Sequence, residues 1–412
     1  MLRCGLLGRT LGHSYSPAIH KELGSYEYRL YEKEPDELAD FLRSGEFDAL
    51  NVTIPYKKDV MAYCAALSET ARRIGSVNTI VRRADGTLYG DNTDADGFAY
   101  MVKTSGVDVT GKKALVFGSG GASVTACDVL KTLGAASVTV ISRSGSDNYE
   151  NLDRHADAEI LVNTTPVGMY PKNGASPVEL AKFPNCRGVF DVVYNPARTA
   201  LLIQAEKLGI ARAGGLSMLV AQARRASELF TGKAIADREI SRIERKLSRQ
   251  MQNIVLVGMP GCGKSVVGAA LAEKLGRALL DSDALVEETA GISIPELFRT
   301  QGEAAFRALE TQALRELGKR SGAVIATGGG SVLREENYDL LHQNGVIVWL
   351  RREISDLPID GRPVSQRIAP SELYRIREPR YRRFADCIVD NCGSVDDAVN
   401  TIMEALHETA HS

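Results

Sequence analysis

The residues with the most specific chemistry form a glycine-rich loop in the second half of the chain. Gly258, Gly263, Lys264 and Ser265 stand at the spacing Gly-x-x-x-x-Gly-Lys-Ser. In such a loop the backbone N–H groups turn inward around phosphate oxygens, the lysine reaches the terminal phosphates, and the serine hydroxyl ligates Mg²⁺. An apolar run over residues 253–257 predicts the strand that must precede the loop. The pattern therefore predicts a site for the phosphates of a nucleoside triphosphate.

Residues suited to a phosphoryl acceptor follow this loop. Asp281 and Asp283 stand at the end of the next predicted strand, two positions apart and hence on the same side of it. One carboxylate can serve Mg²⁺ through water while the other orients or deprotonates an acceptor hydroxyl. Alone, the two aspartates fit a solvated strand end with a helix N-cap equally well. Arg307 and Glu310, three positions apart, are spaced for an ion pair on one face of a helix.

Three glycines and two arginines complete the candidate kinase set. Residues 328–330 are all glycine and follow a predicted strand, which permits a close approach of the backbone to a small ligand. Arg362 and Arg377 suit a carboxylate on the acceptor or the charge of the transferring phosphoryl group. For each arginine, a solvated helix face is the alternative interpretation.

A second glycine-rich loop lies earlier in the chain, at residues 118–123, again after a predicted strand. Its sequence, Gly-Ser-Gly-Gly-Ala-Ser, nearly matches the dinucleotide-binding fingerprint. NAD-binding units carry an acidic residue about 20 positions further on, which binds the ribose hydroxyls. Here the next predicted strand ends in Ser142-Arg143-Ser144. An arginine at this place pairs with a 2′-phosphate and favours NADP; an arginine at an exposed strand end is the alternative.

Polar residues upstream of this second loop have the composition of a site for a polyol acid. A lysine beside a carboxylate can hold charge and move a proton while hydride passes to or from a hydroxyl-bearing carbon. The candidates are two serines in a turn, a threonine and a lysine at a strand end broken by Pro55, an asparagine and an aspartate: Ser14, Ser16, Thr53, Lys57, Asn78 and Asp94.

Three series of alternating strands and helices must position these residues. In the first series we expect strands at 27–33, 49–55 and 76–83, and a helix over 35–45 opened by Pro35. The second series begins near residue 101 and the third at 253. A charged helical stretch at 238–252 is the expected joint between the halves of the chain. Alternating strands and helices throughout predict parallel sheets covered by helices.

Composition places the chain among globular proteins and excludes several classes. At 412 residues it should form two or three domains, at about 150 residues each. A net charge of −2 gives no reason to expect nucleic acid or an anionic membrane as a partner. Seven scattered cysteines favour reduced thiols, and no apolar run approaches the ~20 residues that span a bilayer. The first eight residues suit a core strand better than a signal peptide. We expect a cytoplasmic protein; the sequence leaves its oligomeric state open.

From about Asn253 to the C-terminus the motifs GMPGCGKS, DSD, FRALE, TGGG, GRP and REPRY together resemble shikimate kinase. The resemblance implies that Asp283, Arg307, Gly329 and Arg377 hold shikimate, with Asp283 positioning its 3-hydroxyl. Lys264, Asp283 and Arg362 would be catalytic, Arg362 closing onto the phosphates from a lid. Mg²⁺ would lie at Ser265 with Asp281 nearby. ATP would be bound by Gly261, Cys262, Gly263, Lys264, Ser265, Val266 and Arg362.

Residues 1–247 resemble shikimate dehydrogenase through the motifs HSxSP, NVTIPYK, VNT, GDNTD, GSGGAS, NTTPVGM, DVVYNP and GLSMLVAQA. The resemblance implies that Lys57 and Asp94 are catalytic. The shikimate pocket would comprise Ser14, Ser16, Thr53, Lys57, Asn78, Asp94, Tyr194 and Gln222. NADP would be held by Gly118, Ser119, Gly120, Gly121, Ala122, Ser142, Arg143 and Ser144, with Val192 and Gly215 near the nicotinamide.

The sequence thus predicts an α/β protein with two enzymes. A substrate domain (about 1–100 plus 216–247) and a Rossmann-like NADP domain (about 101–215) would form the dehydrogenase, and a P-loop domain with a parallel sheet, similar to nucleoside monophosphate kinases, would follow at 253–412. The first half would reduce 3-dehydroshikimate to shikimate with NADPH, and the second would phosphorylate shikimate with ATP and Mg²⁺. The alternatives are a non-catalytic sensor of such metabolites, or a first half that oxidises quinate.

Overall fold

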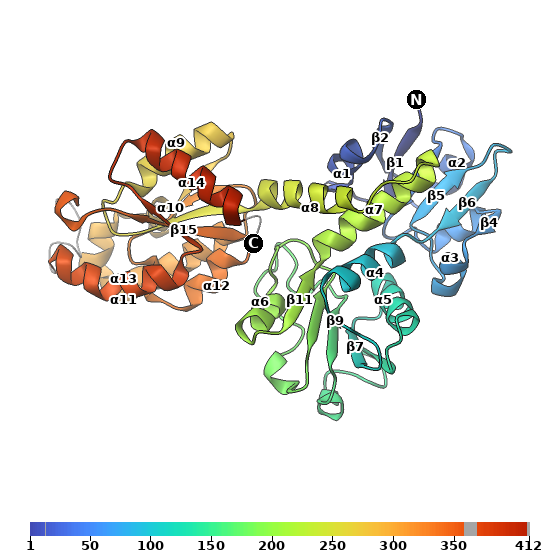
Figure 1. The fold of residues 1–412 in the computed structure, drawn as a ribbon, viewed down its shortest axis with the longest axis horizontal. Coiled ribbons are helices and arrows are strands. Elements are labelled where there is room, and N and C mark those ends of the chain that lie inside the picture. The colour runs from blue at the N-terminus through green and yellow to red at the C-terminus, as the bar shows by residue number, and fades with distance from the viewer. Residues whose placement is uncertain (13, 358–368, 410–412) are drawn as a thin grey trace. The chain divides into compact units, whose positions relative to one another are not determined.

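The computed structural model describes residues 1–12, 14–357 and 369–409. The chain divides into two compact units (Figure 1). The first comprises Met1–Met169, Ala175–Tyr194 and Leu201–Lys246. The second comprises Tyr170–Gly174, Asn195–Ala200 and the chain from Leu247 onward. The main division falls inside the helix α8 (Arg238–Met251), where the charged joint was expected.

The first sheet of the first unit has six strands in the order β2-β1-β3-β5-β6-β4. Strand β3 pairs antiparallel with β5, and β5 pairs antiparallel with β6, whereas the remaining pairs are parallel. The expectation of parallel sheets throughout is therefore wrong for this sheet. The strands are β1 (Arg3–Gly8), β2 (Glu27–Glu32), β3 (Ala49–Val52), β4 (Ala66–Leu67), β5 (Thr79–Arg82) and β6 (Leu88–Asp91).

The antiparallel pairing follows from the short connection between β5 and β6. A parallel pair needs a crossover of a dozen or more residues, and only residues 83–87 are available here. Asp85 Oδ1 accepts a hydrogen bond from the Thr87 N–H (2.9 Å), and Gly86 has φ of 84°, so the segment closes as a hairpin turn. The Asp-Gly pair was the sequence signal for it.

Two further elements differ from their expected bounds. Strand β3 ends at Val52, where the prediction continued it to residue 55, because the Tyr56 N–H turns back onto the Thr53 carbonyl (3.0 Å). Thr53 and Lys57 consequently lie on the loop that follows the strand. The helix α2 (Leu38–Arg43) begins three residues after Pro35, since the Glu37 N–H bonds the Glu34 carbonyl (3.1 Å) in a separate turn.

The second sheet of this unit has the order β11-β10-β9-β7-β8, and every pair in it is parallel. Apolar clusters cover both of its faces, as a Rossmann-like sheet requires. The parallel prediction is confirmed here. The strands are β7 (Lys113–Phe117), β8 (Ser137–Ile141), β9 (Ile160–Asn163), β10 (Gly188–Asp191) and β11 (Ala211–Gly214).

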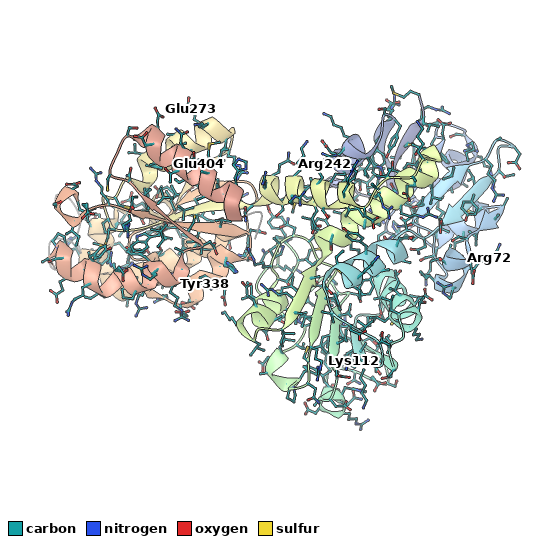
Figure 2. All side chains as sticks on the ribbon, in the orientation of Figure 1. Arg72, Lys112, Arg242, Glu273, Tyr338 and Glu404 are labelled. Atoms are coloured by element: carbon teal, nitrogen blue, oxygen red, sulfur yellow. The ribbon has the colours of Figure 1, made fainter. Side chains whose placement is uncertain are left out.

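The helix α7 (Gly215–Thr231) returns from the second sheet to the first. Its buried residues Ala226 and Phe230 pack against Cys4 of β1 and Ala49 of β3. Arg242 on α8, labelled in Figure 2, forms an ion pair with Glu22 (2.8 Å). The other helices of this unit are α1 (Ser16–Leu23), α2, α3 (Glu69–Ile74), α4 (Asp94–Thr104), α5 (Gly121–Thr132) and α6 (Ala200–Lys207).

The second unit has a five-stranded parallel sheet in the order β13-β14-β12-β15-β16. Its helices lie on both sides of the sheet, with α9 and α14 on one side and α11, α12 and α13 on the other (Figure 1). This is the predicted P-loop architecture. The strands are β12 (Asn253–Val257), β13 (Leu279–Asp281), β14 (Val324–Ala326), β15 (Gly345–Arg351) and β16 (Cys387–Asp390). The helices are α9 (Lys264–Leu275), α10 (Ser282–Ala290), α11 (Ile294–Gly318), α12 (Glu336–His342), α13 (Pro370–Phe384) and α14 (Val395–Thr409).

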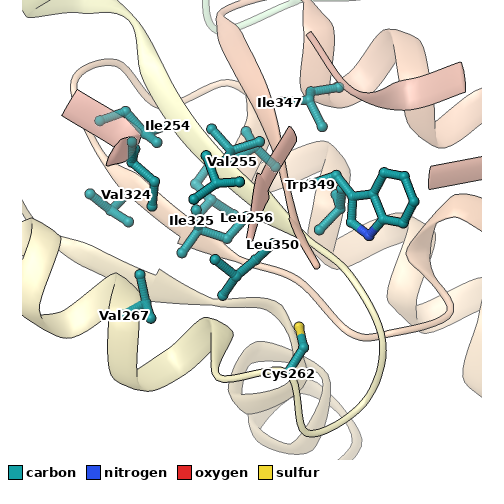
Figure 3. Packing of buried hydrophobic residues seen from close by; sticks show 14 of the residues in the cluster. Ile254, Val255, Leu256, Cys262, Val267, Val324, Ile325, Ile347, Trp349 and Leu350 are labelled. Carbon is teal, nitrogen blue, oxygen red and sulfur yellow. The ribbon is translucent and has the colours of Figure 1, made fainter. Parts of the chain in front are cut away.

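The core of this unit packs around its central strands (Figure 3). Val255 and Ile347 are fully buried, and Trp349, the only tryptophan of the protein, is 1% exposed and stacks on Tyr381 with ring centroids 5.8 Å apart. Within α11, Gly302 has φ of 83° and breaks the helix into two segments. Among the helices of the described ranges, none has the length and hydropathy needed to cross a bilayer.

Two candidate active sites

The lysine and aspartate predicted to be catalytic in the first unit form a close ion pair. Lys57 Nζ lies 2.6 Å from Asp94 Oδ2. Lys57 comes from the loop after β3, and Asp94 opens the helix α4. Both side chains keep contact with solvent, at 27% and 17% exposure, so a substrate can reach them. The structure therefore brings together a lysine and a carboxylate that are 37 positions apart in the sequence.

Asn78 and Gln222 lie next to the Lys57–Asp94 pair, and Thr93 connects them. Asn78 Nδ2 donates to Asp94 Oδ1 (2.9 Å), and Asn78 Oδ1 accepts from the Thr93 N–H (2.7 Å). The Thr93 hydroxyl lies 3.4 Å from Gln222 Oε1 on α7. Thr93 was not among the predicted residues, although it stands inside the GDNTD motif. Its burial, at 0% exposure, fits a residue that holds its neighbours in place.

The predicted residues Ser14, Ser16 and Tyr194 lie near Tyr15, which was not predicted. The Ser16 N–H donates to Ser14 Oγ (3.2 Å), so both lie in one turn at the start of α1. Tyr15, between them, meets Tyr194 edge to face with ring centroids 5.9 Å apart, and burial raises the pKa of both phenols. Thr53 packs close to β1, where its N–H bonds the Leu7 carbonyl (2.9 Å). Within the described part of the chain, neither serine bonds the Lys57–Asp94 pair directly.

The glycine-rich loop after β7 is open in the way a dinucleotide site requires. Gly118 has φ of 112°, and a Cβ there would lie 2.8 Å from Thr164 Oγ1, so only glycine fits. A Cβ on Gly120 or Gly121 would meet nothing within 4 Å, and these two residues begin α5. Ser119 is exposed beside them, and Ala122 follows on the helix. A pyrophosphate can therefore approach the N-terminus of α5.

The other predicted cofactor residues lie at the same edge of the second sheet. Ser142, Arg143 and Ser144 directly follow β8, whose last residue pairs with the last residue of β7. Arg143 is exposed, as a residue that meets a 2′-phosphate must be. A Cβ on Gly215 would lie 2.1 Å from the Val192 carbonyl oxygen, so this glycine allows α7 to start against the end of β10. These residues fit NADP at the carboxyl ends of the strands, where open α/β sheets bind ligands.

The second unit contains a cavity of about 560 Å³ at the carboxyl ends of its strands. It is lined by the glycine-rich loop, by the start of α10, by the middle of α11 and by residues 328–330. Lys264 Nζ donates to the carbonyls of Gly258 and Met259 (both 2.9 Å) and is 8% exposed. The predicted nucleotide residues Gly261, Gly263, Ser265 and Val266 line the cavity, whereas Cys262 is buried in the core.

Ser265 and Asp281 provide oxygen atoms of the kind that Mg²⁺ prefers. Ser265 Oγ donates to Asp281 Oδ2 (3.1 Å). Mg²⁺ commonly takes one or two protein ligands and completes its shell with phosphate oxygens and water. No cluster of three or more His, Cys, Asp or Glu side chains is placed to hold a metal in the described ranges. The two residues fit the metal that the sequence predicts.

Asp283 does not stand on the strand, which corrects the prediction that it shares a strand face with Asp281. Asp281 ends β13 and caps α10, its Oδ1 accepting from the Asp283 N–H (2.9 Å) and the Ala284 N–H (3.3 Å). Asp283 is thus in the first helical turn and lines the cavity. The sequence pattern Asp-Ser-Asp had this alternative reading, because aspartate is a favoured N-cap residue.

Asp283 and Glu310 each turn one buried oxygen toward the cavity without a hydrogen-bond partner among the described residues: Asp283 Oδ1 and Glu310 Oε1. Burial, with Glu310 as the next cause, raises the pKa of Asp283 to about 6. Burial also raises the pKa of Glu310, against the opposing effect of Arg307. The predicted ion pair is confirmed, since Arg307 Nη1 lies 2.7 Å from Glu310 Oε2. Two acceptor oxygens therefore face the place where a hydroxylated ligand would bind.

Each of the three consecutive glycines allows a different side chain of the cavity to approach the backbone closely. A Cβ on Gly328 would lie 2.6 Å from Asp283 Oδ1 and 2.7 Å from Glu310 Oε1. On Gly329 it would lie 2.7 Å from the Pro260 ring, and on Gly330 it would lie 2.1 Å from the Arg307 guanidinium. Arg377, 2% exposed, donates from Nη1 to the Gly329 carbonyl (3.0 Å). The backbone of residues 328–330 therefore lies close to the guanidinium groups of Arg307 and Arg377 and to the carboxylates of Asp283 and Glu310.

Some cavity residues were not predicted, and one predicted residue cannot be placed. Tyr381 is fully buried behind the cavity wall, where its Oη donates to the Gly329 carbonyl; it stands inside the REPRY motif, which was the available signal. Phe298 and Phe306 line the cavity beside the acceptor oxygens, and only their helical spacing could have indicated it. Arg362 lies outside the residues that the structure describes.

Asparagine in place of Asp283 should stabilise the second unit at neutral pH. A carboxyl whose folded pKa is raised contributes stability below its unfolded pKa, near 4, and loses it as the pH rises through about 6. Asp283→Asn removes this loss. We expect a gain of about 2 kcal/mol at pH 7.5 and about half of it at pH 5.0.

Urea unfolding followed by Trp349 fluorescence measures this gain, because the only tryptophan lies in the core of the second unit. Glu404→Gln, which removes an exposed acid of the same unit on α14, is the control. An equal gain at both pH values, or a loss at pH 7.5, would contradict the electrostatic explanation.

Two family models match the chain. The model described as shikimate dehydrogenase substrate binding domain matches residues 6–80, and the model described as shikimate kinase matches residues 260–407. The shikimate dehydrogenase (NADP(+)) of Caldanaerobacter subterraneus subsp. tengcongensis is 36% identical over 258 residues, which cover 56% of this chain and 91% of that protein.

Solved structures agree with the first unit. Shikimate 5-dehydrogenase from Thermus thermophilus, solved with NADP(H) and shikimate, has a TM-score of 0.55 and 32% identity, covering 60% of this chain and 99% of that one. Quinate dehydrogenase from Corynebacterium glutamicum, solved with NAD, has a TM-score of 0.55 and 28% identity, covering 59% and 97%.

Fold and sites define a two-enzyme α/β chain, in which a Rossmann-type dehydrogenase is followed by a P-loop kinase. Its first part belongs to the shikimate dehydrogenase family and its second part is a shikimate kinase domain, so the chain is a bifunctional enzyme of the shikimate pathway that uses NADP and ATP. The sensor alternative has no support from these matches.

Proposed function

We propose that the first unit reduces 3-dehydroshikimate to shikimate and that the second unit phosphorylates the 3-hydroxyl of shikimate. The observation that supports this most directly is the pairing, on one chain, of the Lys57–Asp94 contact with a P-loop cavity whose free carboxylate oxygens suit a hydroxylated acceptor. The order is set by chemistry, because a 3-oxo group offers no hydroxyl to phosphorylate until it is reduced. We assign residues 1–247 to the first enzyme, residues 253–412 to the second, and the cytoplasm as its location.

In the first site, Lys57 and Asp94 manage the proton of the reacting hydroxyl. NADPH, when bound, supplies the hydride. Lys57 Nζ donates a proton to the developing alkoxide, while Asp94 Oδ2 holds the lysine in place and accepts from the neighbouring hydroxyl. Asn78 and Gln222 provide amide groups for the remaining hydroxyls. Ser14 and Ser16 suit the substrate carboxylate, because their turn offers two hydroxyl donors.

In the second site, Asp283 orients the acceptor hydroxyl and accepts its proton. Its raised pKa suits a base that works near neutral pH. Arg307, beside Gly330, and Arg377, which bonds the Gly329 carbonyl, both line the cavity and hold the substrate carboxylate. ATP with Mg²⁺, when bound, supplies the phosphoryl group, for which Ser265 and Asp281 provide the metal ligands. Lys264 exchanges its two carbonyl partners for phosphate oxygens and stabilises the charge that develops on them.

We propose NADP over NAD because Arg143 occupies the place of the acidic residue that binds ribose hydroxyls. Quinate is the second candidate substrate, favoured by the likeness to a quinate dehydrogenase solved with NAD. Values of kcat/KM for shikimate and quinate, each with NADP and NAD, distinguish the two. We expect shikimate with NADP to be the preferred pair; a preference for quinate with NAD would overturn the assignment.

Arg143→Gln should raise the KM for NADP about tenfold and leave the KM for NAD unchanged. The reason is the loss of one charge-assisted contact to a phosphate, which is worth about 1.5 kcal/mol at an exposed site. Arg154→Gln is the control, because it removes an exposed arginine of the same unit from the separate helical turn Leu152–His155. An equal change for NADP and NAD would show that Arg143 does not meet the 2′-phosphate.

A further inference from the structure

A continuous series of hydrogen bonds connects Asp94 with a tyrosine on the edge strand β2. Tyr28 Oη donates to Asn51 Oδ1 (2.8 Å), and Asn51 Nδ2 donates to Thr79 Oγ1 (3.3 Å). Thr79 Oγ1 donates to Asn78 Oδ1 (3.0 Å), and Asn78 Nδ2 donates to Asp94 Oδ1 (2.9 Å). Every step joins two side chains. The series crosses from β2 to β3, β5 and α4, so it links parts of the fold that are far apart in sequence.

The orientation of the Asn78 amide is determined by the donors around its oxygen. A threonine hydroxyl has a single proton. Because Thr79 Oγ1 receives a hydrogen bond from Asn51 Nδ2, its own proton goes either to Asn78 Oδ1 directly or to Thr93 Oγ1 (3.2 Å), whose hydroxyl then donates to Asn78 Oδ1 (3.2 Å). The Thr93 N–H donates to the same oxygen (2.7 Å). With two donors on its oxygen, Asn78 must turn its NH₂ group to Asp94. The reverse orientation would set a carbonyl oxygen against the carboxylate.

The middle of the series is closed to water. Asn51 is 5% exposed, Asn78 is 3% exposed and Thr79 is fully buried. A buried donor or acceptor that loses its partner cannot replace it with solvent, so a break at one step is felt at the next. A surface network would lack this property.

The outer end of the series is held by aromatic packing. The Tyr28 ring stacks on His20 with centroids 4.1 Å apart and planes 10° from parallel. Burial raises the pKa of Tyr28 well above its usual value, so the phenol keeps the proton that it donates. His20 Nδ1 lies 2.6 Å from Tyr26 Oη, and the Asn51 side chain contacts the same imidazole, so Tyr26 is coupled to the series through His20.

We propose that Tyr28, Asn51 and Thr79 are positioning residues of the dehydrogenase, which keep the Asn78 amide directed at Asp94 Oδ1 and thereby leave Asp94 Oδ2 free for Lys57 and the substrate. This inference rests on the roles proposed above for Lys57 and Asp94. It assigns a catalytic consequence to residues that do not touch the substrate, and it predicts that their removal lowers kcat more than it changes cofactor binding.

Two tyrosine variants test the outer end. Tyr28→Phe and Tyr100→Phe each remove one phenol hydroxyl from the same unit, and only the first belongs to the series, since Tyr100 Oη pairs with Ser241 Oγ (3.4 Å). We expect kcat for shikimate oxidation to fall about fivefold in Tyr28→Phe, with the KM for NADP unchanged, and to stay within twofold of wild type in Tyr100→Phe. Equal kcat values for the two variants would overturn the proposal.

Two threonine variants test the middle. Thr79→Val keeps the shape of the side chain and removes its hydroxyl, whereas Thr79→Ser keeps the hydroxyl. We expect kcat to fall about tenfold in the valine variant and to be restored to within about twofold in the serine variant. A loss of kcat in both variants would indicate a packing effect and contradict the positioning role.

Three measurements keep the outcomes distinct in the full-length enzyme. The kinase rate of the same preparation reports the amount of active chain, and NADPH binding reports that the dehydrogenase unit is folded. Asp94→Asn tests the underlying assignment. If Asp94→Asn retains full activity, the proposed catalytic pair is wrong. If Asp94→Asn is inactive and Tyr28→Phe and Thr79→Val match wild type, only the positioning series is wrong.

Discussion

Lys57→Ala is expected to lower kcat for shikimate oxidation by about 10³ and to leave the kinase rate unchanged. A positioned proton donor contributes about 10² to 10⁴ to the rate, and the lysine also balances the charge of Asp94 at 2.6 Å. Its removal therefore takes away the proton donor and leaves the carboxylate unpaired. The KM for NADP should change little, because the cofactor loops belong to the other sheet of the unit.

Lys58→Ala is the matched control for this variant. It removes an exposed lysine one position along the same loop, which lies before the short helical turn Asp59–Tyr63. We expect its dehydrogenase rate to equal that of wild type. Similar losses in both variants would indicate a disturbed loop rather than a lost proton donor, and the role of Lys57 would have to be abandoned.

Lys264→Ala is expected to lower kcat of the kinase by at least about 10³ while the dehydrogenase rate stays at the wild-type value. The lysine ammonium is the charge nearest to the transferring phosphoryl group in a P-loop, and such electrostatic stabilisation is commonly the largest single contribution to the rate. In the structure Nζ is held by two loop carbonyls, which keeps it inside the cavity before a nucleotide arrives.

The control for Lys264 lies on the same helix. Lys274→Ala removes a lysine from the last turn of α9, where Nζ bonds Asn400 Oδ1 (2.6 Å) away from the cavity. Trp349 fluorescence checks that the unit remains folded in both variants, because the alanine at position 264 leaves two loop carbonyls without their donor. A kinase rate in Lys264→Ala within tenfold of wild type would contradict the assigned role.

The sequence was sufficient for those parts of the sites that depend on local order. The glycines of both loops, the Arg307–Glu310 spacing and the placement of Lys57 after a strand are local patterns, and each has a definite backbone or side-chain consequence. The two parallel sheets followed from alternating strands and helices. In contrast, the mixed sheet depended on one short connection, and the Asp-Gly turn in it outweighed the general β/α alternation.

What the sequence could not supply is the direction of side chains in three dimensions. Asp283 was placed on a strand, because a spacing of two residues is equally compatible with a strand end and with the start of a helix. The sequence does not explain why residues 328–330 are all glycine, whereas the structure shows a different side chain close to each of them. Thr93 and Tyr15 are ordinary residues in sequence, and only the fold shows that they join the predicted site residues to one another.

The central claim is that one chain performs two consecutive steps at two separate sites. In the most direct measurement, the wild-type chain and its Lys57→Ala variant are each given NADPH, ATP and Mg²⁺ with either 3-dehydroshikimate or shikimate. The amount of shikimate 3-phosphate formed is then measured. We predict that wild type forms the product from both compounds, with one NADPH oxidised per ADP released from 3-dehydroshikimate. The variant should form it from shikimate alone. Product from 3-dehydroshikimate in the variant at a rate near that of wild type, or none from shikimate in either protein, would contradict the claim.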